Sequence, residues 1–495
     1  MPYTMSSAAA TFLARAQGLY IDGRALPGSS AQPLTVLNPS TAGVLCEFQP
    51  GNRADLDHAA RSAQQAFADG RWRLLPPAEK TRILLRVADL IDAHCSELAE
   101  LEMLDAGKLH RSAEQAEVPF AAECFRYHAG WCTKIAGTTG QMSLAPAGEF
   151  HVYSLREPIG VVGLIVPSNG PLVQASWKLA PALAAGCCCV IKPDEKTPLS
   201  TLRLAELLSE AGIPDGVVNL VTGRGNEVGA AMVEHRALAK ISFTGSTDTG
   251  KEIGRVALAD LKKLTLELGG KSPVIILADA NLEHAIPGAA EAIFSNAGQI
   301  CVAGSRLYVE APVYDQVIEG IVEYATKLVV GPAHDPRSQM GPLISGEHLE
   351  RVLGAVESGR QQGARIATGG SRVHPDGGFF MAPTVLVDVD QDMAVVREEI
   401  FGPVLVATPA RNMQQCLELG NDSRFGLAAS IWTENIGKAH RLAAAVRAGL
   451  VWINCHGIPD MAIPFGGYKQ SGWGRENGLE GLLAYTELKS VVCKL

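Results

Sequence analysis

A repeated alternation of short apolar segments and helical patterns constrains the fold of this chain more than any other feature. Four such segments are each followed by a turn and by roughly ten to twenty residues with apolar side chains at helical spacing. They are residues 160–166, 188–191, 217–221 and 240–243. Strand–helix alternation of this kind predicts a parallel doubly wound sheet. Ligands of such sheets bind in the turns at the carboxyl ends of the strands, so chemistry is expected there.

A second set of alternations begins at residues 273–276. It continues through residues 306–309, 404–407 and 428–431, which is enough for a second α/β domain. The length of 495 residues also exceeds what one compact core holds, so two or three domains are expected. Extended segments at residues 149–155 and 489–492 belong to neither predicted sheet. We expect them to project from the body and to serve subunit contacts.

Charge and cysteine content exclude several function classes. The formal net charge is −9, and no long run of Lys or Arg could follow a phosphate backbone, so nucleic acid is not an expected partner. The 11 cysteines include no Cys-x-x-Cys pair, so no metal site is predicted. The run Cys187-Cys188-Cys189 is interpreted as a buried strand. So many free thiols suit a reducing compartment, and no apolar stretch approaches the ~20 residues of a membrane span, so a cytoplasmic protein is expected.

Two short stretches carry residues suited to acyl chemistry. Cys301 stands in the small-residue loop Gly298-Gln299-Ile300-Cys301-Val302-Ala303-Gly304, where flanking glycines would leave the thiol accessible. Glu267 lies between two leucines and is followed by Gly-Gly. Apolar surroundings raise the pKa of a carboxyl group toward neutrality, as a general base requires. Each stretch alone also allows a plainer interpretation, namely a buried thiol for Cys301 and an ion pair with Lys271 for Glu267.

Two other stretches are suited to binding a nucleotide. Small residues in Phe243-Thr244-Gly245-Ser246 follow a predicted strand and open a helix, where free N–H groups can receive a pyrophosphate. The alternative is an ordinary tight turn, because the full Gly-x-Gly-x-x-Gly pattern is absent. Glu195 follows another strand and could accept hydrogen bonds from a ribose diol. A solvated charged loop explains that segment equally well on its own.

Taken together, the motifs resemble the NAD(P)-dependent aldehyde dehydrogenase superfamily, from about Tyr20 to Val492. The resemblance rests on four elements in the family's order and spacing. They are Glu267-Leu268-Gly269-Gly270-Lys271, Gly298-Gln299-x-Cys301, Glu398-Glu399-Ile400-Phe401-Gly402-Pro403 and Pro464-Phe465-Gly466-Gly467-Tyr468-Lys469-x-Ser471-Gly472.

The resemblance implies an α/β fold class with two doubly wound Rossmann-like domains and a small β extension for oligomerisation. Residues 1–139 and 156–267 would form the NAD-binding domain, and residues 268–477 the catalytic domain. Residues 140–155 and 478–495 would be the oligomerisation strands. The protein is therefore expected to be a homodimer or homotetramer.

The resemblance also implies catalytic roles. Cys301 would be the nucleophile that attacks the aldehyde carbon and later carries a thioester. The side-chain amide of Asn169 and the backbone N–H of Cys301 would hold the oxyanion. Glu267 would activate the water that hydrolyses the thioester. Lys178 matches a lysine that family members keep near the oxyanion Asn, with a supporting role.

Cofactor positions follow in the same way. Lys192 and Glu195 match residues that grip the adenine ribose, and a carboxylate there favours NAD+ over NADP+ because it repels a 2′-phosphate. The other implied contacts are Ile165, Val166, Pro167, Ser168, Gly225, Gly229, Phe243, Gly245, Ser246, Thr249, Leu268, Glu399 and Phe401.

Departures from the family pattern concern the substrate tunnel. Its common Pro-Trp-Asn-[Phe/Tyr]-Pro segment becomes Pro167-Ser168-Asn169-Gly170-Pro171, and Ser295 and Pro459 replace two frequent aromatic residues. Other implied wall residues are Trp177, Ile300, Val302 and Phe465. The losses predict a wider, more polar tunnel and a bulky or polar aldehyde. The rival hypotheses are an enzyme that passes the acyl group to coenzyme A, which Glu267 disfavours, and a binding or structural protein on the same fold.

Overall fold

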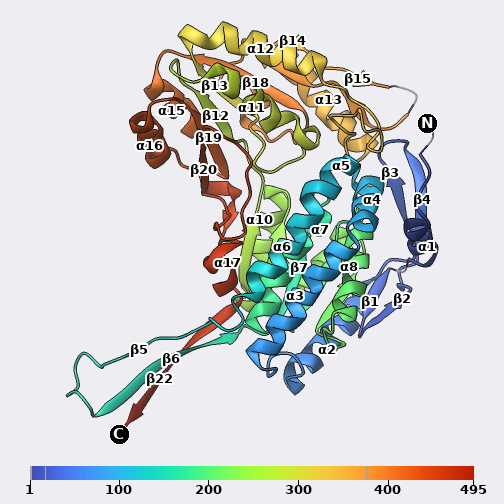
Figure 1. The fold of residues 1–495 in the computed structure, drawn as a ribbon, viewed down its shortest axis with the longest axis vertical. Helices are drawn as coiled ribbons and strands as arrows, with labels where there is room; N and C mark the ends of the chain where they lie inside the picture. Colours follow the sequence, from blue (N-terminus) through green and yellow to red (C-terminus); the bar gives the residue numbers. More distant parts are fainter. Residues whose placement is uncertain (1–2, 17, 375–376) are drawn as a thin grey trace.

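The computed structural model describes residues 3–16, 18–374 and 377–495. Two large sheets, each covered by helices, lie one above the other, and a thin β arm projects from the lower one (Figure 1). The expected ranges 1–139 and 268–477 therefore include a few residues outside the described part. The predicted fold class, two doubly wound α/β domains with a small β extension, is confirmed.

The first sheet has the order β2-β1-β9-β8-β7-β10-β11-β21. Its parallel centre matches the four predicted strands and adds one more, and its edge strands β1, β2 and β21 run antiparallel. The strands are β1 (Leu19–Ile21), β2 (Arg24–Leu26), β7 (Val161–Ile165), β8 (Cys188–Lys192), β9 (Val218–Val221), β10 (Leu238–Thr244), β11 (Lys263–Glu267) and β21 (Gly472–Trp473). The three consecutive cysteines are fully buried at the start of β8, as predicted.

The winding of the chain reverses between β7 and β10. From β7 it passes through α7 (Pro171–Ala185) to β8 and through α8 (Leu199–Glu210) to β9, always in one direction. It then returns through α9 (Ala230–Glu234) to β10 and through α10 (Thr247–Ala257) to β11 on the other side of β7. Right-handed crossovers in opposite directions place these two helix pairs on opposite faces. The carboxyl ends of β7 and β10 thus flank the point where ligands of such sheets bind.

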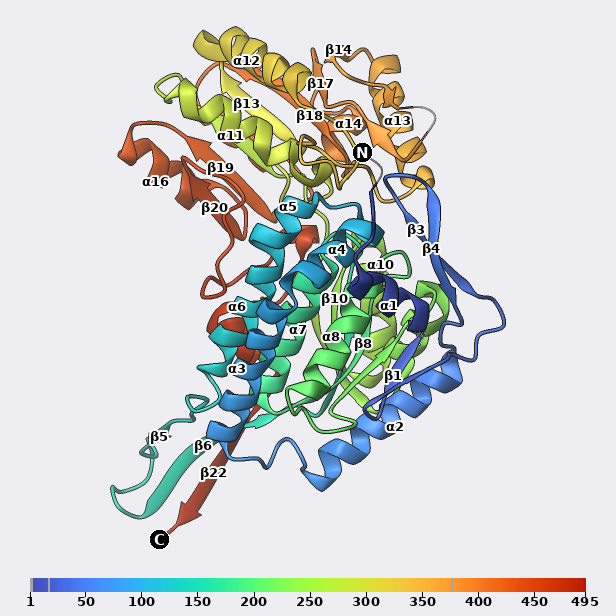
Figure 2. The same cartoon turned by 45° about the vertical axis from the view of Figure 1, so that its right-hand side comes forward.

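Further helices form an outer layer on α7 and α8 (Figure 2). They are α3 (Pro77–Ala93), α4 (Cys95–Ala106) and α6 (Val118–Ala129), while α2 (Arg53–Asp69) packs on β7, β8 and β9. Near the N-terminus lie α1 (Ser7–Arg15) and the hairpin of β3 (Leu34–Asn38) and β4 (Gly43–Phe48). The largest hydrophobic core lies around this first sheet.

The second sheet has the order β14-β17-β18-β13-β12-β19-β20 and its own core. Its strands are β12 (Pro273–Ile276), β13 (Arg306–Glu310), β14 (Arg365–Thr368), β17 (Thr384–Val387), β18 (Val404–Ala410), β19 (Ala428–Trp432) and β20 (Leu450–Ile453). The accompanying helices are α11 (Leu282–Phe294), α12 (Tyr314–Lys327), α13 (Gly346–Gln361), α15 (Met413–Asn421) and α16 (Ile436–Ala445). All four strands predicted for this sheet are present.

The projecting arm contains the two extended segments that the sequence assigned to neither sheet. β6 (Phe150–Pro158) pairs antiparallel with β22 (Thr486–Lys494) along its whole length, and β5 (Thr139–Gly140) pairs with β6. In Figure 1 the arm leaves the lower body and ends near the C-terminus.

Two predicted boundaries need correction near the C-terminus. β21 lies within residues 268–477 but pairs with β11 of the first sheet, so the chain returns to the first body earlier than expected. Residues 478–483 are not an oligomerisation strand, because α17 (Gly478–Leu483) is a helix that packs on α7. The fully buried Leu482 explains this packing, since it belongs to the core of the first body.

No helix in the described part of the chain is both long and apolar enough to cross a membrane.

Candidate active site

Cys301 lies in a reverse turn that follows three residues with left-handed backbone. The N–H of Ala303 donates to the carbonyl of Ile300 at 3.0 Å, which places Cys301 at the second position of the turn. Ahead of the turn, Asn296, Ala297 and Gly298 have φ values of 48°, 52° and 71°. Left-handed backbone at non-glycine residues costs free energy and is concentrated at functional sites. At Gly298 a Cβ atom would lie 2.0 Å from the carbonyl oxygen of Gly402, so only glycine fits.

Asn169 and Gln299 hold this loop from the other side. Asn169 follows β7, and its side-chain Nδ2 donates to the carbonyl oxygen of Gln299 at 3.0 Å. The Gln299 side chain donates to the carbonyl oxygens of Asn296 and Pro342 and accepts from the N–H of Ile344. A primary amide has two N–H donors. Asn169 therefore uses one of them to fix its position and keeps a second for another acceptor beside Cys301.

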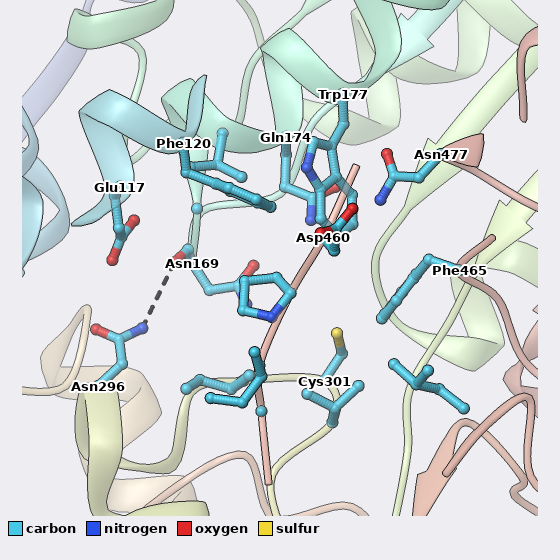
Figure 3. A pocket seen from close by; sticks show the side chains of 18 of the residues that line it. Glu117, Phe120, Asn169, Gln174, Trp177, Asn296, Cys301, Asp460, Phe465 and Asn477 are labelled. Carbon is cyan, nitrogen blue, oxygen red and sulfur yellow. Dashed lines mark hydrogen bonds between the residues drawn. The ribbon is translucent and has the colours of Figure 1, made fainter. Parts of the chain in front are cut away.

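Two cavities meet at Cys301. One is a tunnel of about 290 Å³, and the other is a groove of about 540 Å³ along the carboxyl edge of the first sheet. Asn169, Gln174 and Cys301 line both. In Figure 3 the sulfur of Cys301 points into the tunnel between Asn169 and Phe465. A molecule in the tunnel and a molecule in the groove would thus meet at the thiol.

Glu267 ends β11 and lines the groove. It is 3% exposed, and neither carboxylate oxygen has a hydrogen-bond partner among the described residues. Burial raises its pKa well above the ordinary value, and the nearby Glu476 adds to this effect, while Lys178 and Arg475 oppose it. A carboxyl group with a raised pKa and no fixed partner is free to exchange a proton.

Lys178 lies close enough to Glu267 for its charge to affect the pKa of that carboxyl group. It is fully buried, and its Nζ donates to Ser242 at 3.1 Å and forms an ion pair with Glu476. Ser242 also donates to Glu476 at 2.8 Å. Among the described residues Lys178 bonds Ser242 and Glu476, and it does not bond Asn169. Its observed effect is to balance the charge of Glu476 next to Glu267.

The thiol of Cys301 is protonated at neutral pH in this structure. Burial raises its pKa to about 12, and the carboxyl groups of Glu399 and Glu267 add to the shift. The thiolate is the nucleophile in cysteine chemistry, so proton removal must accompany attack.

This pKa makes a prediction about alkylation of the cofactor-free protein. Only the thiolate reacts with iodoacetamide, so the rate at Cys301 should rise about tenfold per pH unit between about pH 7 and pH 9, without levelling off. Mass spectrometry of the peptide that contains Cys301 would follow the rate. A plateau below about pH 8.5 would contradict the raised pKa. Cys493, which is exposed, provides an internal comparison.

The groove brings together the predicted cofactor residues. Of those predicted, the following line it: Ile165, Val166, Pro167, Ser168, Lys192, Glu195, Gly225, Phe243, Gly245, Ser246, Thr249, Leu268, Glu399 and Phe401. Gly229 does not line the groove but lies beside it, since a Cβ atom there would be 3.8 Å from the side chain of Lys192.

The groove is built from ordinary features of strand ends and helix starts. Ser246 caps α10, and its hydroxyl accepts from the N–H of Thr249, so the N-terminus of this helix faces the groove. Lys192 and Glu195 form an ion pair at 3.3 Å at the end of β8. Burial pushes the pKa of Glu195 upward, but Lys192, Lys196 and a backbone hydrogen bond together lower it below its ordinary value.

The carboxyl group of Glu399 packs directly against the backbone of Gly269 and Gly270. Its Oε1 accepts from the N–H of Gly270 at 3.0 Å, and a Cβ atom at Gly269 would lie 2.1 Å from its Oε2. The same groove wall includes His348 and Arg351 of α13, which the sequence did not reveal. His348 Nε2 donates to the carbonyl of Phe401 at 2.7 Å. No local motif marks these residues, because they reach the site only through tertiary packing.

Six of the seven predicted tunnel residues line the tunnel, namely Gly170, Trp177, Ile300, Val302, Pro459 and Phe465. Ser295 is exposed and does not; its neighbour Asn296 does. Most residues that line the tunnel are apolar, but the charged residues Lys108, Glu117 and Asp460 also line it. Phe120 and Trp452 supply two further rings that no local motif predicts. Trp177 packs against Phe465 at 5.2 Å and against Phe120 at 6.2 Å between ring centroids.

Comparisons with known proteins agree with this geometry. The model of the aldehyde dehydrogenase family matches residues 26–491. The chain belongs to the aldehyde dehydrogenase family. It is 44% identical to phenylacetaldehyde dehydrogenase of Pseudomonas fluorescens over 96% of this chain and 95% of that protein. It is 42% identical to the mitochondrial benzaldehyde dehydrogenase of Antirrhinum majus over 96% of this chain and 89% of that protein.

A solved structure extends the comparison to the cofactor. The NAD+ complex of an aldehyde dehydrogenase from Bacillus cereus is 44% identical, covers all of both chains and superposes with a TM-score of 0.97. The predicted enzyme class, an NAD-dependent aldehyde dehydrogenase, is thereby confirmed. The residues of the groove fit such a cofactor, because a helix N-terminus suits a pyrophosphate and the half-buried carboxylate of Glu195 suits a ribose diol.

Proposed function

We propose that this aldehyde dehydrogenase oxidises ring-bearing aldehydes to carboxylic acids with NAD+, through a thioester on Cys301. One observation carries the proposal: Cys301 lies where the tunnel meets the groove, with the amide of Asn169 beside it and Glu267 in the same groove. This arrangement provides a nucleophile, an oxyanion donor and a base around one point.

Each residue would act in turn on the aldehyde. The thiol of Cys301 would first lose its proton to solvent, a loss that the positive charge of bound NAD+ would favour. The thiolate attacks the carbonyl carbon, and the oxygen becomes an oxyanion that the N–H of Cys301 and the second N–H of Asn169 would hold. Bound NAD+ would accept the hydride from the same carbon. Glu267 then takes a proton from water, whose oxygen attacks the thioester carbon. The bond between that carbon and the sulfur breaks, the acid leaves, and the proton on Glu267 passes to the thiolate of Cys301.

The tunnel favours a flat apolar group next to the aldehyde. Phe120, Trp177, Trp452 and Phe465 line it, and offset or edge contacts between aromatic rings contribute about 0.5–1.5 kcal/mol each beyond burial. The small residues Gly170 and Pro459 leave room for a ring. The relatives named for phenylacetaldehyde and benzaldehyde are consistent with this choice.

A steady-state screen tests the substrate class. NADH formation is measured with aliphatic, aromatic, amino and semialdehyde substrates, and the highest kcat/KM is expected for an arylaldehyde or arylacetaldehyde. Acetaldehyde as the best substrate would refute the proposed class. Turnover that requires added coenzyme A would instead favour acyl transfer over hydrolysis.

Glu195 is proposed to set the preference for NAD+ over NADP+. A carboxylate near a 2′-phosphate is repelled by a few kcal/mol at an effective dielectric constant of about 20. Glu195→Gln should therefore raise the ratio of kcat/KM for NADP+ to that for NAD+ by about tenfold or more. Glu227→Gln is the matched control, since Glu227 is close to Gly225 in sequence but does not line the groove. An unchanged ratio in Glu195→Gln would remove this residue from cofactor selection.

The β arm is proposed to join subunits. In the described part of the chain β22 has a partner strand on one side only, and its Leu488 and Val492 are 57% and 56% exposed. An unpaired edge with apolar side chains is a template for another strand. Leu488→Glu with Val492→Glu should lower the mass measured by light scattering to that of a smaller assembly or a monomer. Ile436→Glu, at an equally exposed site on α16, should leave the mass unchanged.

A further inference from the structure

One backbone carbonyl of the nucleophile turn needs a partner from outside the turn. A reverse turn closed between Ile300 and Ala303 pairs only its first carbonyl and last N–H, so the carbonyls of the two middle residues are left over. Val302 supplies one of them and is buried. A buried carbonyl without a hydrogen bond costs free energy, so its partner fixes the orientation of the peptide.

That partner is His456. Its Nε2 lies 2.9 Å from the carbonyl oxygen of Val302, and its Nδ1 lies 3.0 Å from the hydroxyl of Ser430 in β19. A carbonyl can only accept, so Nε2 carries the proton and Nδ1 accepts from Ser430. Burial lowers the pKa of His456 to about 4, which keeps the ring neutral and in this single tautomer near neutral pH.

The ring is also held by its neighbours. Trp452 of β20 packs against His456 at 4.8 Å between ring centroids. A Cβ atom at Gly304 would lie 3.4 Å from Cε1 of His456, so the turn and the imidazole are in close contact. The indole N–H of Trp452 donates to the carbonyl of Ile458 in the tunnel wall. The stacked rings of His456 and Trp452 thus contact both the turn that carries Cys301 and the wall of the tunnel.

His456 follows β20 near the tunnel, but its ring is not placed to bind a substrate. Both nitrogens are occupied by protein groups, and His456 is not among the residues that line the tunnel.

We propose that His456 is a positioning residue: by donating to the carbonyl of Val302, it holds the turn in the orientation that presents the thiol and the N–H of Cys301 to the aldehyde. The inference rests on the proposed role of Cys301 as nucleophile. Loss of the donor leaves a buried carbonyl unpaired, and the turn relaxes toward another partner. A displacement of about 1 Å at reacting groups can cost about 100-fold in rate.

Two amide variants test whether the N–H donor to Val302 must lie at the place of Nε2 or whether any side-chain N–H at residue 456 is enough. In His456→Gln the side-chain N–H lies near the place of Nε2, whereas in His456→Asn it lies near the place of Nδ1. The rate constant of the first NADH burst is measured with saturating NAD+ and an aromatic aldehyde, together with the alkylation rate of Cys301 and the Tm. His456→Asn should slow the burst by about 10- to 100-fold, with KM for NAD+ changed less than about twofold. His456→Gln should recover most of the wild-type rate.

His128 is the matched control. It is another buried histidine, whose Nδ1 bonds the carbonyl of Cys124 at 2.8 Å within α6. His128→Gln removes the donor from the place of Nδ1, so it should lower the Tm as much as His456→Asn does but leave the burst unchanged. A merely structural role of His456 would instead make the two variants equivalent in both measurements.

Three outcomes would overturn the inference. They are a wild-type burst in His456→Asn, equal losses in His456→Asn and His456→Gln at equal Tm, and a loss in His128→Gln as large as that in His456→Asn. If either His456 variant fails to fold, Ser430→Ala decides, because it removes only the hydroxyl that bonds Nδ1. A several-fold slower burst is expected in Ser430→Ala, and an unchanged burst contradicts the inference. A wild-type protein that forms no NADH from any aldehyde would refute the proposed function instead.

Discussion

Replacing Cys301 with alanine should abolish the NADH burst and lower steady-state turnover by about four orders of magnitude or more, because no other cysteine of the described residues lines the tunnel or the groove. A loss of this size corresponds to more than about 5 kcal/mol of transition-state stabilisation. Stopped-flow and steady-state absorbance of NADH measure the two quantities.

Cys455→Ala is the control for this variant. Cys455 packs in the same small hydrophobic cluster as Cys301 but does not line either cavity. It removes one thiol from the same region and should retain the burst. Residual burst activity in Cys301→Ala would show that another nucleophile carries the reaction.

Replacing Glu267 with glutamine should separate the two halves of the reaction. The variant should release about one equivalent of NADH per site and then stall, with steady-state turnover lower by about 10²- to 10⁴-fold, because a general base contributes an effect of that size. Acid quench and mass spectrometry should find the acyl group on Cys301. Unchanged turnover would remove Glu267 from the mechanism.

The stability of Glu267→Gln provides a second measurement. A carboxyl group whose pKa is raised in the folded state stabilises the fold below its unfolded pKa, and this contribution is lost as the pH rises through the folded value. Above the unfolded pKa, burying Glu267 therefore opposes folding, and increasingly so as the pH rises toward the folded value. Glutamine removes this cost, so the Tm of the variant at alkaline pH should equal or exceed that of the wild type. A lower Tm there would mean that the variant loses activity for structural reasons.

Local sequence predicts the sheets well because each parallel strand is a short run of buried apolar residues between turns. β8 and β12 are fully buried along their length and stand out for that reason. Cys301, Glu267 and Asn169 were found because each lies in a short motif at a strand end. The positions of such residues depend mostly on neighbours within the same motif.

The tunnel could not be predicted in the same way. Phe120 comes from α6 and Trp452 from β20, and only the packing of distant segments brings their rings to Cys301. The loss of aromatic residues from the segment 167–171 therefore does not predict how many rings line the whole tunnel. Ser295 was misplaced because the left-handed backbone at Asn296 and Ala297 reverses the chain after α11 and turns Asn296 inward.

The late return of the chain to the first sheet also bears on the order of synthesis. Glu267 pairs with Gly472, and the charge of Glu476 helps to raise its pKa. At Gly466 a Cβ atom would lie 2.8 Å from Oε1 of Glu267. All three residues follow the parallel strands of both α/β bodies in the sequence. A growing polypeptide that already contains Cys301 but not these residues therefore lacks the groups that enclose Glu267. A chain truncated before Gly466 would carry the nucleophile without a complete hydrolytic site.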